Sequence, residues 1–298
     1  MSSFYSHGKL LLTGEYAVLK GAKALAVPCK LGQFLTYKEK EQTTLYWKSL
    51  DSNGRVWFEA KFDIVTLQLQ HTSADEIWEN LLKLLRATKQ LNPQFLKQGG
   101  TVETKLEFKR SWGLGSSSTL VSALSLWAKV DPYLLLEMSF GGSGYDIACA
   151  QAKGPLIYSR INKIPEVETV SLSYPFIDQL YFVYLNKKRD SQEAVARFDK
   201  SALTRSHIQK ISMLTAKILA AKEQSEFNTL LQIHEETLAE LLKQKPIQES
   251  LFSDFKGVIK SLGAWGGDFV LASANYNPID YFTQKGYRVV IPFKEMVL

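Results

Sequence analysis

The chain has little cysteine and no long apolar stretch. Its 298 residues include two cysteines, Cys29 and Cys149, and neither belongs to a metal-binding spacing or a disulfide framework, which suits a reducing compartment. No apolar run reaches the roughly 18 residues that a membrane-spanning helix needs, and the first residues lack the pattern of a secretory signal peptide. We therefore expect a cytoplasmic protein with no membrane partner.

Positive charge is in excess, but it is not concentrated in one segment. The formal net charge is +6, and the longest basic run, Lys187 to Arg189, is too short for a polybasic tail. An anionic small molecule accounts for the excess as well as a nucleic acid does. We expect a small anionic substrate and no nucleic-acid partner.

A glycine- and serine-rich stretch lies between a predicted strand and a predicted helix. Residues 102–108 alternate apolar and charged side chains, as in a half-buried strand, and residues 120–128 have apolar side chains at helical spacing. The stretch between them comprises Gly113, Leu114, Gly115, Ser116, Ser117, Ser118 and Thr119. It thus lies at a helix N-terminus, where unpaired N–H groups and a partial positive charge suit a bound phosphate.

Neither common nucleotide fingerprint is present in this stretch. The Gly-Lys-Ser/Thr of a P-loop is missing, and Ser118 stands where a dinucleotide-binding loop has its third glycine. A flexible turn or a plain helix cap is therefore an alternative interpretation.

Two more segments pair glycine with charged residues. Near the N-terminus, Lys9 precedes an apolar strand that is broken at Gly14 and followed at once by Glu15. In residues 141–150, Asp146 stands between a glycine-rich turn and an apolar run, as expected at a helix start. Taken alone, the first pattern is also that of solvated charges, and the second that of an ordinary N-cap.

Together these segments resemble the GHMP kinase superfamily, which includes galactokinase, homoserine kinase, mevalonate kinase and phosphomevalonate kinase. Residues 8–19 are similar to its first motif, 113–118 to its second, 143–146 to its acidic Ser-Gly-x-Asp segment, and 263–271 to its third, glycine-rich motif. The four motifs occur in the family's order and span nearly the whole chain. Gly14-Glu15-Tyr16 and Gly266-Gly267-Asp268 look more like phosphomevalonate kinase than mevalonate kinase, whereas Trp265 replaces a usual glycine.

The resemblance implies a two-domain α+β fold. Residues 1–175 would form an N-terminal, ribosomal S5 domain 2-like domain that carries the phosphate loop 113–119. Residues 176–298 would form a C-terminal α/β sandwich with helices that closes the substrate cleft. A monomer or a homodimer is expected.

The resemblance also implies ATP and Mg²⁺ as cofactors and assigns roles to individual residues. Gly113 to Thr119 would hold the phosphates, and Ser117 would ligate Mg²⁺, with Glu137 as a further metal candidate. Asp146 would act as general base or orient the acceptor, and Lys9 would stabilise negative charge. Candidate substrate residues are Glu15, Tyr16, Arg189, Ser191 and Gly266.

Three functions remain open at this point. The first is an isoprenoid-pathway kinase acting on phosphomevalonate or mevalonate. The second is a diphosphomevalonate decarboxylase-like enzyme, which shares the fold. The third is a non-catalytic nucleotide- or RNA-binding protein, against which the joint presence of Lys9, Ser117 and Asp146 argues.

The remaining pattern predicts a strand over 180–185, a final strand over 287–292, and helices from about 201 to 262, broken near Lys222 and Pro246. A further helix is predicted from about 74 to 90, with Ser73 and Glu76 as its capping box. His234 falls on the apolar face of the helical stretch, which favours a core histidine over a metal ligand.

Overall fold

A computed structural model describes residues 1–74, 77–189, 191–198 and 202–298. The chain forms two compact units, each assembled from several segments. The first unit comprises Met1–Gly8, Leu31–Arg110 and Leu114–Gln151, and the second comprises Lys9–Lys30, Ser111–Gly113 and Ala152–Leu298.

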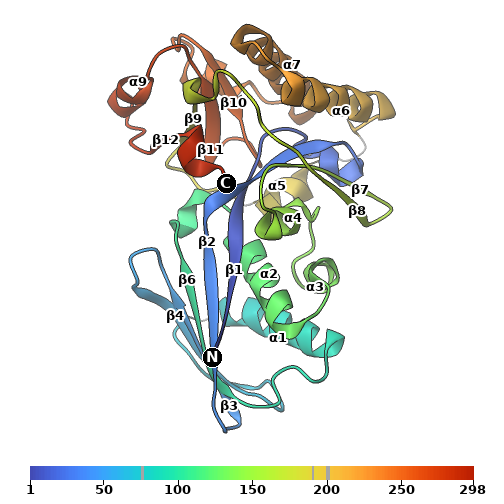
Figure 1. The fold of residues 1–298 in the computed structure, drawn as a ribbon, viewed down its shortest axis with the longest axis vertical. Coiled ribbons are helices and arrows are strands. Elements are labelled where there is room, and N and C mark those ends of the chain that lie inside the picture. The colour runs from blue at the N-terminus through green and yellow to red at the C-terminus, as the bar shows by residue number, and fades with distance from the viewer. Residues whose placement is uncertain (75–76, 190, 199–201) are drawn as a thin grey trace. The chain divides into compact units, whose positions relative to one another are not determined.

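The first unit contains a twisted sheet with helices on one face (Figure 1). Its strands lie in the order β5-β4-β3-β6-β2, and all neighbours are antiparallel except β3 and β6. The strands are β1 (Ser2–Leu11), β2 (Ala24–Glu39), β3 (Thr44–Leu50), β4 (Val56–Asp63), β5 (Leu69–Thr72) and β6 (Gly100–Leu106). Strand β1 pairs with β2, and both strands continue into the second unit.

Alternating side chains of these strands form the core of the first unit. Trp47 and Phe58 on the sheet are buried in one cluster with Leu85 and Leu124 on the helices, as the period of two in the strands requires. The helices are α1 (Ile77–Leu91), α2 (Ser116–Ala128), α3 (Pro132–Ser139) and α4 (Tyr145–Gln151), with a 3₁₀ turn η2 (Arg110–Trp112). The core thereby fixes where α2 begins.

The second unit contains a four-stranded antiparallel sheet in the order β10-β11-β9-β12. A hairpin of β7 (Leu156–Ile161) and β8 (Ile164–Thr169) pairs with the first residues of β2. The sheet strands are β9 (Leu180–Tyr184), β10 (Val258–Ser261), β11 (Phe269–Ser273) and β12 (Val290–Pro292).

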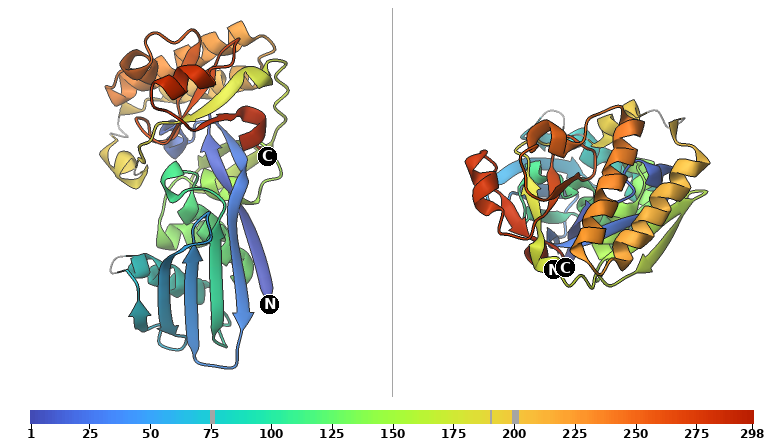
Figure 2. Two further views of the ribbon diagram at one scale, coloured as in Figure 1. Left: turned by 90° about the vertical axis from the view of Figure 1, so that its left-hand side faces the viewer. Right: turned by 90° about the horizontal axis from the view of Figure 1, so that it is seen from above.

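The second unit also contains helices, of which the orange pair α6 and α7 lie side by side (Figure 2). They are α5 (Ser191–Arg197), α6 (Arg205–Ala220), α7 (Gln224–Leu242), α8 (Ile247–Leu251), α9 (Ile279–Gln284) and α10 (Phe293–Met296), with 3₁₀ turns η1 (Ala17–Lys20) and η3 (Ile177–Gln179). Within the described ranges, no helix is long and apolar enough to cross a membrane.

Most predicted elements are confirmed, and three details are wrong. Lys9 lies inside β1, which ends at Leu11, and does not precede a strand. The helical stretch ends at Leu251, and residues 258–261 form β10 instead, because each of them pairs with a residue of the next strand, β11. Ser73 does not cap α1, since its hydroxyl bonds the backbone of Glu59; its proposed partner Glu76 lies outside the described residues.

A close backbone approach joins two motifs within the second unit. Gly113 has a φ of 66°, and a Cβ built on it would lie 2.2 Å from the carboxylate of Asp268. Backbone bonds hold Asp268 in turn, because its N–H donates to Lys187 O and its carbonyl accepts from the Leu185 N–H. Only glycine fits at position 113 without displacing this carboxylate.

We predict that Gly113→Ala destabilises the protein more than Gly54→Ala by about 1 to 3 kcal/mol, because only Gly113 also faces a collision. Gly54 is a matched control, since its φ is 77° and a Cβ added there would meet nothing within 4 Å. Chemical denaturation measures both free energies of unfolding. The double variant Gly113→Ala/Asp268→Gly should recover the difference, and equal losses in the two single variants would contradict this packing.

Candidate active site

The loop formed by residues 113–119 has a backbone geometry that suits anion binding. Gly115 is the N-cap of α2 in the left-handed conformation, with φ 89° and ψ 43°, and no side chain caps the helix. The N–H groups of Ser116, Ser117 and Ser118 have no hydrogen-bond partner among the described residues, whereas the Thr119 N–H donates to Gly115 O at 2.9 Å. These three donors, at the positive end of a 13-residue helix, suit phosphate oxygens.

The side chains of the loop divide into two groups. Ser118 and Thr119 are buried and bonded internally, because Ser118 Oγ donates to Gly115 O and Thr119 Oγ1 donates to Gln33 Oε1. Leu114 is fully buried, so it anchors the loop through packing. Ser117 is exposed and Ser116 half-buried, which leaves their hydroxyls as the side-chain donors or ligands of the loop.

Asp146 lies in the same unit as α2. It is the second residue of α4, it is half-buried, and α4 packs against α2. Gln151 Nε2 donates to Ser122 Oγ at 2.7 Å and joins the two helices. Glu137, the further metal candidate, is exposed on α3.

A second group of charges gathers in the second unit around Asp268. Its carboxylate accepts from the Arg189 N–H at 3.1 Å and lies against Gly113. Burial raises the pKa of Asp268 above its ordinary value, while the bond from Arg189 and the charges of Lys9 and Lys188 oppose that rise. Three segments separated in sequence, namely β1 at Lys9, the turn 187–189 and the third motif, thus bring charged groups close enough to act on Asp268.

The candidate substrate residues of the second unit lie near this group but differ in exposure. Tyr16 is buried, its hydroxyl donates to Ala264 O at 2.9 Å, and burial raises its pKa to about 12 against the opposing charge of Arg189. Gly266 has φ 73° and open space at its Cβ position. Ser191 begins α5, and its side chain lies outside the described residues.

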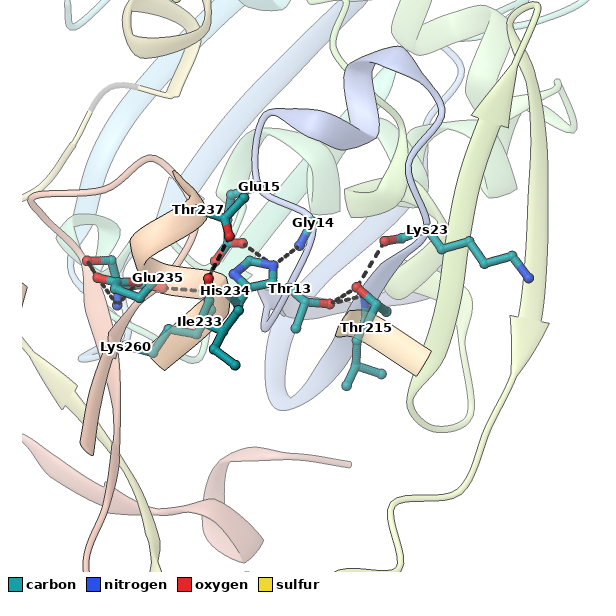
Figure 3. Close-up of polar contacts among 12 residues, drawn as sticks. Thr13, Gly14, Glu15, Lys23, Thr215, Ile233, His234, Glu235, Thr237 and Lys260 are labelled. Atoms are coloured by element: carbon teal, nitrogen blue, oxygen red, sulfur yellow. Dashed lines mark hydrogen bonds and ion pairs between the residues drawn. The ribbon is translucent and has the colours of Figure 1, made fainter. Parts of the chain in front are cut away.

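Glu15 points into the protein core rather than toward solvent (Figure 3). Its carboxylate forms an ion pair with Lys260, and both side chains are fully buried. His234, also fully buried, accepts a hydrogen bond from the Gly14 N–H at its Nε2, which lies 3.7 Å from Glu15 Oε2. The expectation of a core histidine is thereby confirmed.

This buried cluster contains two carboxyl groups, Glu15 and Glu235, but a single lysine, Lys260. The Glu235 carboxylate accepts hydrogen bonds from the N–H and the hydroxyl of Ser261. Burial raises the pKa of Glu15 to about 7 despite Lys260, and it also raises the pKa of Glu235. Burial and the charge of Lys260 hold the pKa of His234 well below its ordinary value, so the imidazole is neutral.

Sequence reasoning missed Asp268, Lys260 and the backbone role of His234. Asp268 had a signal, because it ends the Gly-Gly-Asp triplet that begins with the candidate Gly266. Lys260 had none, since a lysine inside a short apolar segment is ordinarily a solvated residue, and its partner is 245 positions away.

The donor set fits a magnesium ion that is carried by a nucleotide. No group of three His, Cys, Asp or Glu side chains suited to a metal occurs in the described part of the chain. Mg²⁺ keeps several waters and is commonly held by one or two protein oxygens together with substrate phosphates. The exposed hydroxyl of Ser117 at the start of α2 matches that requirement.

We predict that Glu15 makes stability fall as pH rises from about 4.5 to about 7. Its folded-state pKa is raised, so in this range the folded protein keeps a proton that the unfolded chain has released. Relative to Glu15→Gln, wild type should lose about 1 to 3 kcal/mol between pH 4.5 and 8 in denaturant titrations.

His234 contributes the opposite slope below pH 6.5, but it is present in both proteins. The exposed Glu236 on α7 supplies the control, and Glu236→Gln should follow wild type. Parallel curves for wild type and Glu15→Gln would contradict the raised pKa.

No protein-family model and no curated protein sequence matches the chain. Solved structures do match over nearly its whole length. The mevalonate kinase of Methanococcus jannaschii is 17% identical, with a TM-score of 0.70 over 97% of this chain and 96% of its own. The phosphomevalonate kinase of Streptococcus pneumoniae, in complex with phosphomevalonate and AMPPNP, is 16% identical, with a TM-score of 0.72 over 97% and 99%.

The galactokinase of Lactococcus lactis, complexed with galactose, is also similar, at 14% identity and a TM-score of 0.63 over 95% of this chain and 88% of its own. These proteins are all GHMP kinases, and their acceptors differ in chemistry. At such identities the likeness establishes the fold and not the acceptor. The chain therefore has the GHMP kinase fold that its four sequence motifs predict.

Proposed function

We propose that the chain is an ATP-dependent kinase that transfers the γ-phosphoryl group to a small anionic acceptor, phosphomevalonate or mevalonate. The observation that carries the proposal is the row of unpartnered N–H groups at Ser116, Ser117 and Ser118, behind a left-handed Gly115. Such a row holds phosphates without sequence-specific side chains. The structural neighbours that are kinases support the same class of reaction.

In the proposed reaction, an acceptor oxygen attacks the γ-phosphorus and the bond to the β–γ bridging oxygen breaks, releasing ADP. Transfer of this kind depends mainly on positioning and on charge stabilisation. Lys9 would neutralise charge on the transferring group. If the acceptor is a hydroxyl, Asp146 would take its proton; if it is a phosphate, Asp146 would orient it.

Magnesium supplies charge neutralisation of the phosphates when it is bound with ATP. Ser117 is the residue proposed to hold it, because its hydroxyl is exposed beside the loop amides. Glu137 stays a second candidate on α3.

An anionic acceptor is favoured by the basic turn that follows β9. Lys187 and Lys188 are exposed there, and Arg189 is half-buried with its backbone held by Asp268. A phosphate on the acceptor would gain charge-assisted hydrogen bonds from such side chains, each worth roughly 1.5 to 3 kcal/mol.

The direct test is Mg-ATP turnover with mevalonate, phosphomevalonate, homoserine and sugars, with ADP release and ³¹P NMR of the products. Phosphorylation of phosphomevalonate or mevalonate is the expected result. Diphosphomevalonate is assayed alongside, and release of carbon dioxide from it would identify a decarboxylase instead. Turnover of a neutral sugar alone would contradict the proposal of an anionic acceptor. Absence of ADP release with every acceptor would contradict the proposed kinase activity.

We predict that Asp146→Asn lowers kcat by about 10²- to 10⁴-fold while ATP affinity stays within about threefold, because a proton acceptor or orienting charge is lost. Asp131→Asn is the matched control: Asp131 caps α3 through backbone N–H groups, a role that asparagine fills. Steady-state kinetics and calorimetry provide the numbers. A folded Asp146→Asn variant that keeps more than about a tenth of wild-type kcat would remove Asp146 from the mechanism.

Arg189→Ala should raise KM for a phosphorylated acceptor by about 10-fold or more and leave KM for ATP nearly constant, because one charged contact to the acceptor is lost. The exposed Arg55, in the β3–β4 turn, provides the control variant Arg55→Ala, which removes the same charge. Equal KM shifts in the two variants would show that the effect comes from the protein's net charge and not from a contact between Arg189 and the acceptor.

A further inference from the structure

The turn at Gly14, Glu15 and Tyr16 has a backbone that needs external support. Gly14 has φ 84°, and a Cβ there would lie 2.6 Å from Ala24 Cβ. Tyr16 has φ 59° and ψ −44°, an unusual conformation for a residue with a side chain. Such a conformation persists only where surrounding contacts determine it.

Three successive residues of this turn are held by three different elements. The Gly14 N–H donates to His234 Nε2 of α7 at 3.1 Å. The Glu15 carboxylate pairs with Lys260 of β10. The Tyr16 hydroxyl donates to Ala264 O, four residues before Asp268.

These anchors are connected to the charged group of the candidate site. The Tyr16 hydroxyl bonds Ala264 O in the third motif, and the carboxylate of Asp268 in the same motif accepts a hydrogen bond from the Arg189 N–H. A displacement of the turn would therefore reach the residues proposed to contact the acceptor. Every contact on this route lies within the second unit.

Two polar atoms of the cluster are buried without a partner. Neither Glu15 Oε2 nor His234 Nδ1 has a protein hydrogen-bond partner among the described residues. Because Nε2 accepts from Gly14, Nδ1 carries the proton of the neutral ring.

We propose that His234 and Lys260 are positioning residues, which hold the Gly14–Tyr16 turn in the geometry required for phosphoryl transfer. The inference rests on the proposed kinase function. His234 acts through the backbone of Gly14, and Lys260 acts through the carboxylate of Glu15. Neither contacts a substrate.

The experiment compares His234→Leu, His234→Gln and Thr215→Val. Leucine cannot accept the Gly14 hydrogen bond, whereas the glutamine side-chain oxygen can. Thr215→Val is the matched structural control: Thr215 Oγ1 bonds Thr13 Oγ1 at 2.8 Å and donates to Lys23 O at 3.1 Å, so the change removes two hydrogen bonds, one of them to the residue before the turn. Each variant is measured for kcat, for KM of ATP and for Tm.

His234→Leu should lower kcat by at least about 10-fold and leave KM of ATP within about threefold of wild type, because misplaced groups slow phosphoryl transfer more than they weaken ATP binding. His234→Gln should restore kcat to within about threefold of wild type, and Thr215→Val should lower Tm without lowering kcat. A kcat that follows Tm across all three variants, or full activity of His234→Leu, would overturn the inference.

A second measurement keeps the inference testable where a variant is unstable or the kinase proposal is wrong. In wild type, ¹⁵N NMR should find His234 as the Nδ1–H tautomer, with the Gly14 amide protected from hydrogen exchange. In His234→Gln that protection should persist, and in Glu15→Gln/Lys260→Met, which removes the pair without leaving a lone charge, it should fall by about 10-fold or more.

The Leu25 amide, bonded to Thr13 Oγ1 at 3.0 Å, is the internal reference for exchange. If wild type phosphorylates no acceptor, the proposed function fails, and hydrogen exchange of the Gly14 amide alone decides whether His234 and Lys260 hold the turn. An Nε2–H tautomer of His234, or unchanged Gly14 exchange in the double variant, would show that they do not.

Discussion

The buried pair of Lys260 and Glu15 is the interaction on which the second unit depends. Removing both charges from water is costly, and the cost is offset only where geometry and further hydrogen bonds satisfy the two groups. Lys260 meets this condition, because it also donates to Ser261 O. Glu15 meets it in part, since one oxygen is unpaired and its pKa is raised to about 7. The pair therefore fixes the first motif while leaving it sensitive to protonation.

The first unit presents a row of backbone N–H donors at the start of α2, where we propose that an anion binds. Its core holds α2 through Val121 and Leu124, and Leu114 anchors the loop before the helix. The buried hydroxyls of Ser118 and Thr119 are used within the loop, so the amides of 116–118 stay open. A preorganised phosphate site requires both features: a packed core that holds the loop in place and backbone N–H groups that are free to bind the anion.

Local pattern was sufficient for much of this fold and for part of the site. The strand–loop–helix around residues 100–128 was predictable because alternation and helical spacing are local signals. Strand β10 was not, because a four-residue strand is defined by its pairing with β11. Asp268 and Lys260 were missed for a different reason: their contacts, Gly113 and Glu15, are remote in sequence, and burial of a charge cannot be inferred from its neighbours along the chain.

A crystal structure with Mg-AMPPNP tests the central claim, that the glycine- and serine-rich loop binds the nucleotide phosphates. We predict that phosphate oxygens accept hydrogen bonds from the N–H groups of Ser116, Ser117 and Ser118, with the metal on Ser117 Oγ. A nucleotide bound elsewhere on the protein, with these three amides left to water, would contradict it.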